Sequence, residues 1–358
     1  MPPLAELPLE LPIAPMLAKA VTTIPAADSV PGGLAYEPKW DGFRAIVLRG
    51  GDDIELCSRG GKSLNRYFPE VIQALARLLP PVCALDGEIV VRSGPPGAQR
   101  LDWDALSQRI HPADSRVQLL AQQTPAEFIA FDLLAIGGED LTGAPLQVRR
   151  QRLELALAHL RLEDPVHVSA LTQDAELAGQ WFDRFEGAGL DGVIAKPWAG
   201  PYTPGKRTLL KIKHRRTADA VVTGYRVHTS GQGVGSLLLG VYADNGHLMN
   251  VGGIAAFTQV RRRELIEELA PLVVRDEAGQ ALHAETDRSR FSANKDVSYV
   301  PLRPERVVEV AFDQLEGYRF RHAVTFLRWR PDKDPTECRY DQIDRATAYD
   351  LAKVLHTG

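Results

Sequence analysis

In the first 216 residues, short runs of apolar and β-branched residues alternate with a few amphipathic stretches. Two of the runs, 45–48 and 54–57, flank Gly50-Gly51-Asp52-Asp53, a turn sequence typical of a β-hairpin. Further strands are expected at 84–91, 127–134, 193–196 and 209–213. Helices are expected at 70–79 and at 146–160, where leucines recur with helical spacing. Hairpins outnumber regular βαβ units, which favours an α+β domain of antiparallel sheets with flanking helices.

The pattern changes after residue 216. Residues 196–216 form a basic stretch without a single acidic residue, and the first 35 residues form a proline-rich, extended lead-in. From residue 219 onward short strands are joined by tight turns, with one expected helix at 258–269 and late strands at 307–312 and 324–329. This order fits a small β-barrel such as an OB-fold. We therefore expect two domains, 1–216 and 217–358, the second being an OB-fold with a C-terminal extension.

Composition agrees with two ordinary globular domains. The chain has 358 residues, of which 44% are hydrophobic and 25% charged, and its formal net charge of −4 gives no sign of a nucleic-acid partner by itself. Cys57, Cys83 and Cys338 are far apart and form no C-x-x-C pair, which argues against a disulfide framework or a Cys₄ zinc site. No secretory signal and no apolar run of about 20 residues is present, so we expect a cytoplasmic protein without a membrane segment.

The strongest local signal is the sequence from Glu37 to Arg44, EPKWDGFR. A lysine amine is a good nucleophile only when deprotonated, which burial, nearby cations or a bound metal can favour. Lys39 stands two residues before Asp41 in this sequence. Taken alone, K-x-D-G can equally be a surface lysine before a turn.

Five further motifs follow Lys39 in order along the chain: SRGGK at 58–62, LDGEIV at 85–90, FDLL at 131–134, DGVIAK at 191–196 and LKIK at 210–213. Together with Lys39 this set resembles the motifs of the covalent nucleotidyltransferases, which include ATP-dependent DNA ligases, RNA ligases and mRNA capping enzymes. The chain is most similar to the bacterial ATP-dependent ligases of the ligase C type and the ligase domain of ligase D. The resemblance covers nearly the whole chain.

The resemblance implies that Lys39 carries AMP and that nearby side chains bind ATP. Lys211 and Lys213 stand two positions apart in an expected strand, so their side chains lie on the same face and can contact one phosphate. The resemblance implies that this is the α-phosphate of ATP. Phe131, otherwise a core residue, would stack on adenine. Glu88 would bind the ribose hydroxyls, and Glu37 would read adenine partly through its backbone.

The resemblance also implies a divalent metal, Mg²⁺ or Mn²⁺, held by Asp191 with Asp41 as a second candidate ligand. Many relatives have Glu at the position of Asp191, so the ligand here is one methylene shorter.

Four arginines complete the candidate site together with one more lysine. A guanidinium matches phosphate geometry with two hydrogen bonds, although each of these arginines could also be a plain surface residue. Arg44 and Arg59 would contact the AMP or the 5′-phosphate of the nick, and Arg207 lies in a similar but more weakly aligned stretch. Near the C-terminus, Arg330 and Lys333 in R-P-D-K resemble the last ligase motif, which orients the leaving pyrophosphate.

These implications describe an ATP-dependent DNA ligase that seals 5′-phosphate/3′-hydroxyl nicks, with a role in repair. Its partner would be nicked duplex DNA, held through the backbone by the basic stretch and the barrel. We expect a monomer that works beside separate repair polymerases or end-binding proteins.

Three other readings stay open at this point. An RNA ligase or a capping guanylyltransferase shares the lysine chemistry. An NAD-dependent ligase is disfavoured, because the extra N-terminal domain and the cysteine cluster of that class have no counterpart here. A non-catalytic OB-fold protein would explain residues 219–345 but would leave Lys39 and its motifs without a purpose.

Overall fold

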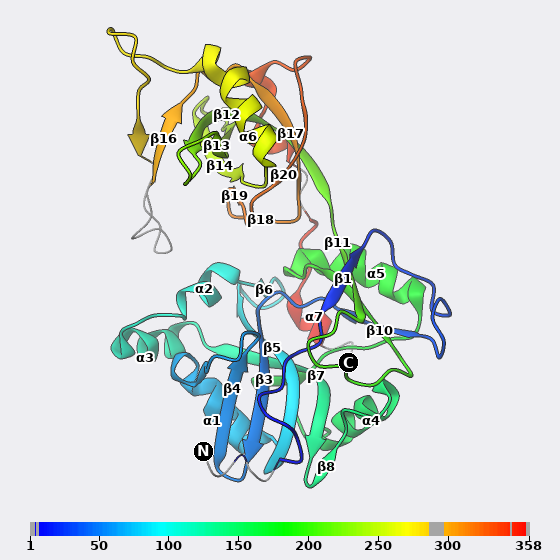
Figure 1. Ribbon diagram of the computed structural model, residues 1–358. Coiled ribbons are helices and arrows are strands. Elements are labelled where there is room, and N and C mark those ends of the chain that lie inside the picture. Colours follow the sequence, from blue (N-terminus) through cyan, green and yellow to red (C-terminus); the bar gives the residue numbers. More distant parts are fainter. Residues whose placement is uncertain (1–3, 5–6, 286–296, 344–345, 356–358) are drawn as a thin grey trace. The chain divides into compact units, whose positions relative to one another are not determined.

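A computed structural model describes residues 4, 7–285, 297–343 and 346–355. The chain divides into two compact units, which are described separately (Figure 1). The first comprises residues 1–213 together with 346–358, and the second comprises residues 214–345.

The larger sheet of the first unit is almost entirely antiparallel. Its strands run in the order β4-β3-β5-β7-β8, with β6 paired to β5 and β9 paired in parallel to β7. The bounds are β3 Phe43–Gly50, β4 Asp53–Ser58, β5 Val82–Ser93, β6 Arg100–Leu101, β7 Ala126–Ile136, β8 Glu139–Asp140 and β9 Val166–Val168. The predicted hairpin is confirmed: β3 and β4 pair across a turn in which Gly51 has φ +61°, a conformation that favours glycine.

The smaller sheet has four strands in the order β1-β11-β10-β2. The bounds are β1 Ala18–Val21, β2 Leu34–Pro38, β10 Gly192–Pro197 and β11 Leu209–Lys213. β10 pairs antiparallel with both β2 and β11, while β1 pairs in parallel with β11. The strand β1 lies within the lead-in that we expected to be merely extended.

Helices cover the sheets of the first unit (Figure 1). They are α1 Pro69–Leu78, α2 Trp103–Gln108, α3 Asp114–Gln123, α4 Leu146–Ala156, α5 Ala175–Phe185 and α7 Leu351–Leu355, with short 3₁₀ turns η2 Asn65–Tyr67 and η3 Glu186–Ala188. The helix expected over 146–160 ends four residues early, at Ala156. We did not predict α5, which follows the N-cap residue Asp174 and buries Trp181 and Phe185.

The C-terminal residues belong to a different unit from the one we expected. We assigned them to the second domain, but α7 packs in the first unit, where Leu351 and Val354 are each only 1% exposed. They join a hydrophobic cluster with Trp40, Trp181 and Phe185. The backbone N–H of Leu351 also donates to the carbonyl of Gln99, at 2.8 Å.

The second unit is built on one long strand, β12 (Arg216–Val227). β12 pairs antiparallel with β13 along one edge and with β16 and β17 along the other, while β14 extends the sheet beyond β13 and β20 pairs with β17. The other bounds are β13 Val234–Tyr242, β14 Leu248–Ile254, β15 Ala284–Glu285, β16 Ser298–Pro301, β17 Val307–Phe312, β18 Leu315–Glu316, β19 Arg319–Phe320, β20 Thr325–Trp329 and α6 Gln259–Leu269, with 3₁₀ turns η4 Ala270–Leu272, η6 Pro335–Glu337 and η7 Tyr340–Gln342.

The α+β class is confirmed in both units. In the second unit, the described residues form hairpin-joined strands and one α-helix, the elements we expected of an OB-fold. The barrel assignment itself stays a prediction. Within the described part of the chain, no helix has the length and apolar character needed to cross a membrane.

Candidate active site

Lys39 follows β2 directly and is held against the start of β10. Its backbone N–H donates to the carbonyl of Gly192 at 2.9 Å, and the N–H of Asp191 donates back to the carbonyl of Lys39 at 3.1 Å. The Lys39 ammonium forms an ion pair with the Asp191 carboxylate. Lys213 Nζ, at the end of β11, lies 2.9 Å from the same Asp191 oxygen. Three segments far apart in the sequence thus meet at one carboxylate.

The charge state of Asp191 follows from these neighbours. Its side chain is 5% exposed, and burial alone would favour the neutral acid. The two ammonium groups of Lys39 and Lys213 outweigh that burial and hold the pKa of Asp191 below its usual value. Lys211, two residues before Lys213, has a lowered pKa because it is partly buried among cations. The site is therefore rich in positive charge around one carboxylate.

Phe131, on β7, contacts cations from both sheets. The guanidinium carbon of Arg44, on β3, lies 4.3 Å from the ring centroid, and Lys196 Nζ, on β10, lies 4.7 Å from it. The ring is only 5% exposed. Such cation–π contacts are worth about 0.5–2 kcal/mol each. In this state the ring is covered, so a nucleobase could stack on it only after a cation moves.

Glu37 and Lys196 form a second buried pair beside Phe131. Lys196 Nζ lies 2.8 Å from Glu37 Oε2, and Glu37 is 3% exposed. Burial raises the pKa of Glu37, although Lys196 and Arg150 oppose the rise. Among the described residues, Glu37 Oε1 is buried without a hydrogen-bond partner. That oxygen is an acceptor available to a ligand.

Glu88 and Arg44 lie opposite each other on β5 and β3. Glu88 Oε1 accepts a hydrogen bond from the backbone N–H of Gly42, at 3.1 Å. A side chain at Gly42 would come within 2.1 Å of the carbonyl of Ile89, so only glycine fits at this point of the lysine motif. Burial raises the pKa of Glu88 to about 7, against the effect of Arg44 and Lys39.

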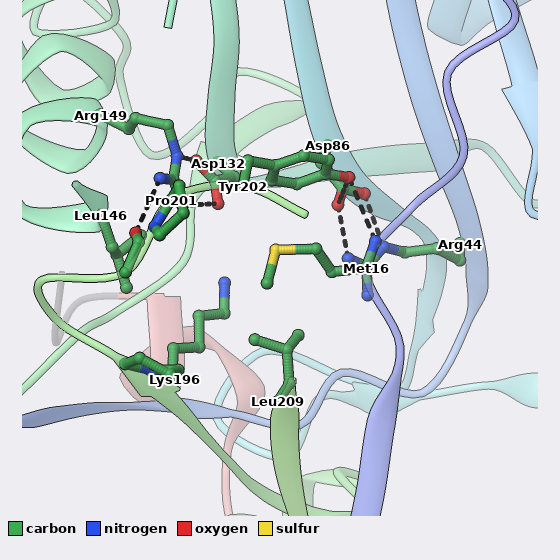
Figure 2. A pocket seen from close by; sticks show the side chains of 12 residues that line it. Met16, Arg44, Asp86, Asp132, Leu146, Arg149, Lys196, Pro201, Tyr202 and Leu209 are labelled. Atoms are coloured by element: carbon green, nitrogen blue, oxygen red, sulfur yellow. Dashed lines mark hydrogen bonds and ion pairs between the residues drawn. The ribbon is translucent and has the colours of Figure 1, made fainter. Parts of the chain in front are cut away.

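Two arginine pairs, each with a buried carboxylate, line a pocket next to these residues (Figure 2). Arg44 donates to both oxygens of Asp86, at 2.6 and 2.5 Å, and Arg149 donates to both oxygens of Asp132, at 2.7 and 2.9 Å. The hydroxyl of Tyr202 donates to Asp86 Oδ2 at 2.7 Å. We did not single out these partner residues from the sequence. Asp86 and Asp132 could have been found, since each lies inside a quoted motif, but Tyr202 lies in an irregular loop.

Other expected site residues lie elsewhere. Arg59 is exposed in the turn after β4, and Arg207 is exposed in the loop before β11, where it donates to the carbonyl of Ala18 at 3.1 Å. Arg330 and Lys333 belong to the second unit, and both pair with Asp219, at 3.0 and 2.9 Å. Asp41 is half-buried in the turn after Lys39. The roles expected of these residues stay predictions.

No group of three or more His, Cys, Asp or Glu side chains that could hold a metal occurs within the described ranges. Asp191 still fits a divalent cation, because it is a buried carboxylate at the centre of the site. Mg²⁺ is commonly held by one or two carboxylates together with phosphate oxygens of a substrate. A metal here would therefore depend on the bound nucleotide.

The sheets and the lysine site are those of a nucleotidyltransferase unit followed by a second domain. Two family models match, the ATP dependent DNA ligase domain over residues 15–213 and the ATP dependent DNA ligase C terminal region over residues 230–333. The chain therefore belongs to the ATP-dependent DNA ligases. This answers the choice that the sequence left open between DNA ligases, RNA ligases, capping enzymes and non-catalytic OB-fold proteins.

Within this family the chain is similar to the ligase C proteins of mycobacteria. It is 52% identical to DNA ligase C1 of Mycolicibacterium smegmatis, covering 98% of this chain and 99% of the relative. It is 50% identical to DNA ligase C of Mycobacterium tuberculosis, with the same coverage. A solved structure from a study of Lig E DNA ligases shares the fold, with a TM-score of 0.54 and 18% identity over 88% of this chain and 99% of that one.

Proposed function

We propose that this ligase seals nicks through a covalent AMP adduct on Lys39. Lys39 Nζ, after losing a proton to solvent, attacks the α-phosphate of ATP, so that an N–P bond forms as the bond to pyrophosphate breaks. The AMP then moves to the 5′-phosphate of a nick, and the 3′-hydroxyl finally displaces AMP as the phosphodiester forms. The protein contributes mainly position and charge.

The observation that carries this proposal is the shared carboxylate of Asp191. When Lys39 becomes bound to AMP it loses its positive charge, and an unpaired buried carboxylate would be costly. Lys213 remains paired with Asp191 at 2.9 Å and prevents that outcome. The arrangement therefore supports a lysine that leaves its ion pair during each reaction cycle.

The neighbouring groups fit the parts of ATP. Lys211 and Lys213 would hold the α-phosphate, and Glu88 would accept from the ribose hydroxyls. The free Oε1 of buried Glu37 could accept a hydrogen bond from the adenine amino group. Phe131 would stack on the base once Lys196, one of the two cations over its ring, has moved.

A bound Mg²⁺ or Mn²⁺ ion would neutralise charge on the phosphates. Asp191 would hold it together with phosphate oxygens, and Asp41 is the second candidate ligand. Arg44, Arg59 and Arg207 are proposed as contacts to AMP or to the 5′-phosphate.

The proposed setting is DNA repair in the cytoplasm. The substrate is nicked duplex DNA, bound through phosphates and therefore sensitive to salt. The three cysteines form no disulfide, which suits a reducing compartment. We propose a monomer that cooperates with a separate polymerase or with end-binding proteins.

The direct test is to incubate the chain with α-labelled ATP and magnesium, denature it, and measure label on the protein. We expect labelling of the wild type, none of Lys39→Ala, and normal labelling of Lys19→Ala, a control at an exposed lysine of β1. Label on Lys39→Ala would place the nucleophile elsewhere. Labelled GTP and a nicked RNA duplex, run in parallel, test the preference for ATP and DNA.

A further inference from the structure

Tyr202 connects the two sheets of the first unit through a buried hydroxyl group. It lies in the loop between β10 and β11, strands of the smaller sheet, and is 4% exposed. Its hydroxyl donates to Asp86 Oδ2, on β5 of the larger sheet, at 2.7 Å, and accepts from the backbone N–H of Met16 at 3.3 Å (Figure 2). A loop of one sheet thus reaches a carboxylate of the other.

Asp86 is the residue that orients Arg44. The carboxylate is completely buried, and its Oδ2 accepts from both Tyr202 and Arg44. The same guanidinium lies over the ring of Phe131. Tyr202, Asp86, Arg44 and Phe131 therefore form a continuous chain of contacts that ends at the proposed adenine site.

The direction of the Tyr202 hydrogen bond is fixed. Burial and the adjacent carboxylate of Asp86 raise the pKa of Tyr202 far above its usual value, so the hydroxyl keeps its proton and donates it to Asp86. Donation from Tyr202 limits how Asp86 can turn, and a two-point pair with Arg44 transmits that limit to the guanidinium plane.

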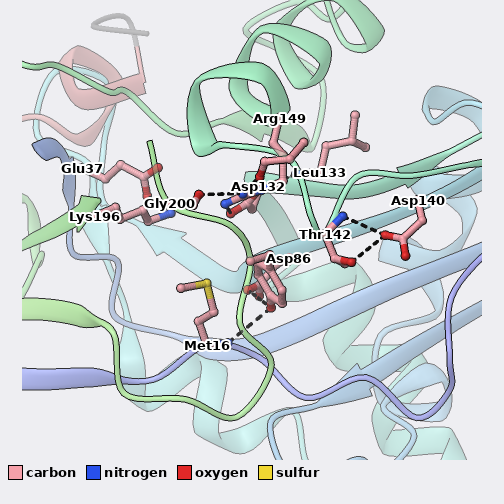
Figure 3. Close-up of polar contacts among 12 residues, drawn as sticks. Met16, Glu37, Asp86, Asp132, Leu133, Asp140, Thr142, Arg149, Lys196 and Gly200 are labelled. Atoms are coloured by element: carbon pink, nitrogen blue, oxygen red, sulfur yellow. Dashed lines mark hydrogen bonds and ion pairs between the residues drawn. The ribbon is translucent and has the colours of Figure 1, made fainter. Parts of the chain in front are cut away.

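The loop that carries Tyr202 is itself held in place. The N–H of Tyr202 donates to the carbonyl of Thr142 at 2.8 Å. Arg149 donates to the carbonyl of Gly200 at 3.1 Å while it pairs with Asp132 (Figure 3). Asp132 follows Phe131 directly in the sequence. The loop is thus held at Gly200, through Arg149, to the residue that follows Phe131, and at Tyr202 to Thr142.

The geometry points to Tyr202 as a positioning residue that holds Arg44, through Asp86, in the orientation needed for adenylylation of Lys39. This inference rests on the proposed function, since Arg44 must act on the nucleotide for its orientation to matter. The loop between β10 and β11 would then have a role in positioning Arg44, in addition to connecting the two strands that carry Lys196, Lys211 and Lys213.

The test is a double-mutant cycle on the rate of covalent AMP formation, measured in a single turnover at subsaturating ATP. Tyr202→Phe keeps the ring and removes the hydroxyl, and we expect it to slow the reaction about tenfold, the scale of one hydrogen bond to a charged group. In an Arg44→Ala background the same change should alter the rate by less than about twofold, because its target is gone. Tyr36→Phe is the matched control, since Tyr36 is buried and its hydroxyl donates to the carbonyl of Pro25 at 2.6 Å.

Each outcome decides the inference. A tenfold loss that persists in the Arg44→Ala background would mean that Tyr202 supports the fold or acts by another route, and the inference would be wrong. No loss for Tyr202→Phe would also overturn it. A general loss of stability cannot imitate coupling, because it would slow both backgrounds alike. If the wild type forms no adduct at all, the proposed function fails instead.

Discussion

The C-terminal segment is expected to be necessary for the first unit, although it follows the second unit in the sequence. The perturbation is Leu351→Ala, which truncates a side chain that is 1% exposed and belongs to the same hydrophobic cluster as Trp40, the residue next to Lys39. Truncation of a buried leucine to alanine costs about 2–5 kcal/mol. A domain of ordinary stability has only about 5–15 kcal/mol in total, so one substitution should remove a large part of it.

Deletion of residues 346–358 should cost more than the single substitution. Burial of a leucine or valine side chain contributes about 1.5–3 kcal/mol, so Leu351 and Val354 together account for roughly 3–6 kcal/mol. The deletion also removes the hydrogen bond between Leu351 and the carbonyl of Gln99. We expect a chain that ends at residue 345 to retain every ligase motif and yet form little lysyl-AMP at 37 °C.

The measurement is unfolding in urea, followed by tryptophan fluorescence, together with label transfer from α-labelled ATP. Trp40 and Trp181 lie in the affected cluster and report on it directly. Leu162→Ala is the control, because that leucine is 45% exposed and its loss should be nearly neutral. The reasoning is refuted if the chain ending at 345 unfolds at the wild-type urea concentration and forms the adduct at the wild-type rate.

Three further predictions concern the site. Phe131→Ala should weaken ATP binding far more than Phe131→Trp or Phe131→Tyr, since stacking on a base is worth about 1–3 kcal/mol; equal losses, by equilibrium titration, would favour a packing role. The double variant Arg330→Ala/Lys333→Ala should lose at least about 100-fold in adenylylation and still seal a nick that already carries AMP; equal losses in both assays would mean a role in DNA binding. The folded-state pKa of Glu88, about 7, lies above its ordinary value of 4.5, so the charged form of Glu88 opposes folding. The free energy of unfolding should therefore fall by up to about 3 kcal/mol as the pH rises from 4.5 to 7. Glu88→Gln should flatten that slope in urea titrations at pH 4.5 and 7.5, and an unchanged slope would contradict the assignment.

Elements with a clear local pattern were predictable from the sequence. The β3–β4 hairpin, α1 and the strands that carry the motifs lie within a few residues of their expected positions. Lys211 and Lys213 are an example, because alternate side chains of a strand lie on the same face whatever the rest of the fold is. The expected length of α4 was wrong because its last leucines continue the helical spacing after the helix has ended.

The long-range contacts were not predictable from one sequence. Asp86 and Tyr202 are separated by 116 positions, and no periodicity connects them. The docking of α7 is a similar case, since five residues are too few to show where an apolar face will be buried. Both depend on how the whole unit packs, and local propensity does not carry that information.

In both units, the cations that we propose to act on phosphates pair with one shared aspartate. In the first, Asp191 pairs with Lys39 and Lys213; in the second, Asp219 pairs with Arg330 and Lys333. Two cations held close together repel each other unless an anion lies between them, and before a nucleotide binds that anion must come from the protein. A carboxylate with two partners can release one of them to a phosphate and still remain paired, so the release costs less than breaking an isolated buried ion pair. This is a physical reason why an aspartate, which carries the wrong charge for binding ATP directly, lies at the centre of each cluster.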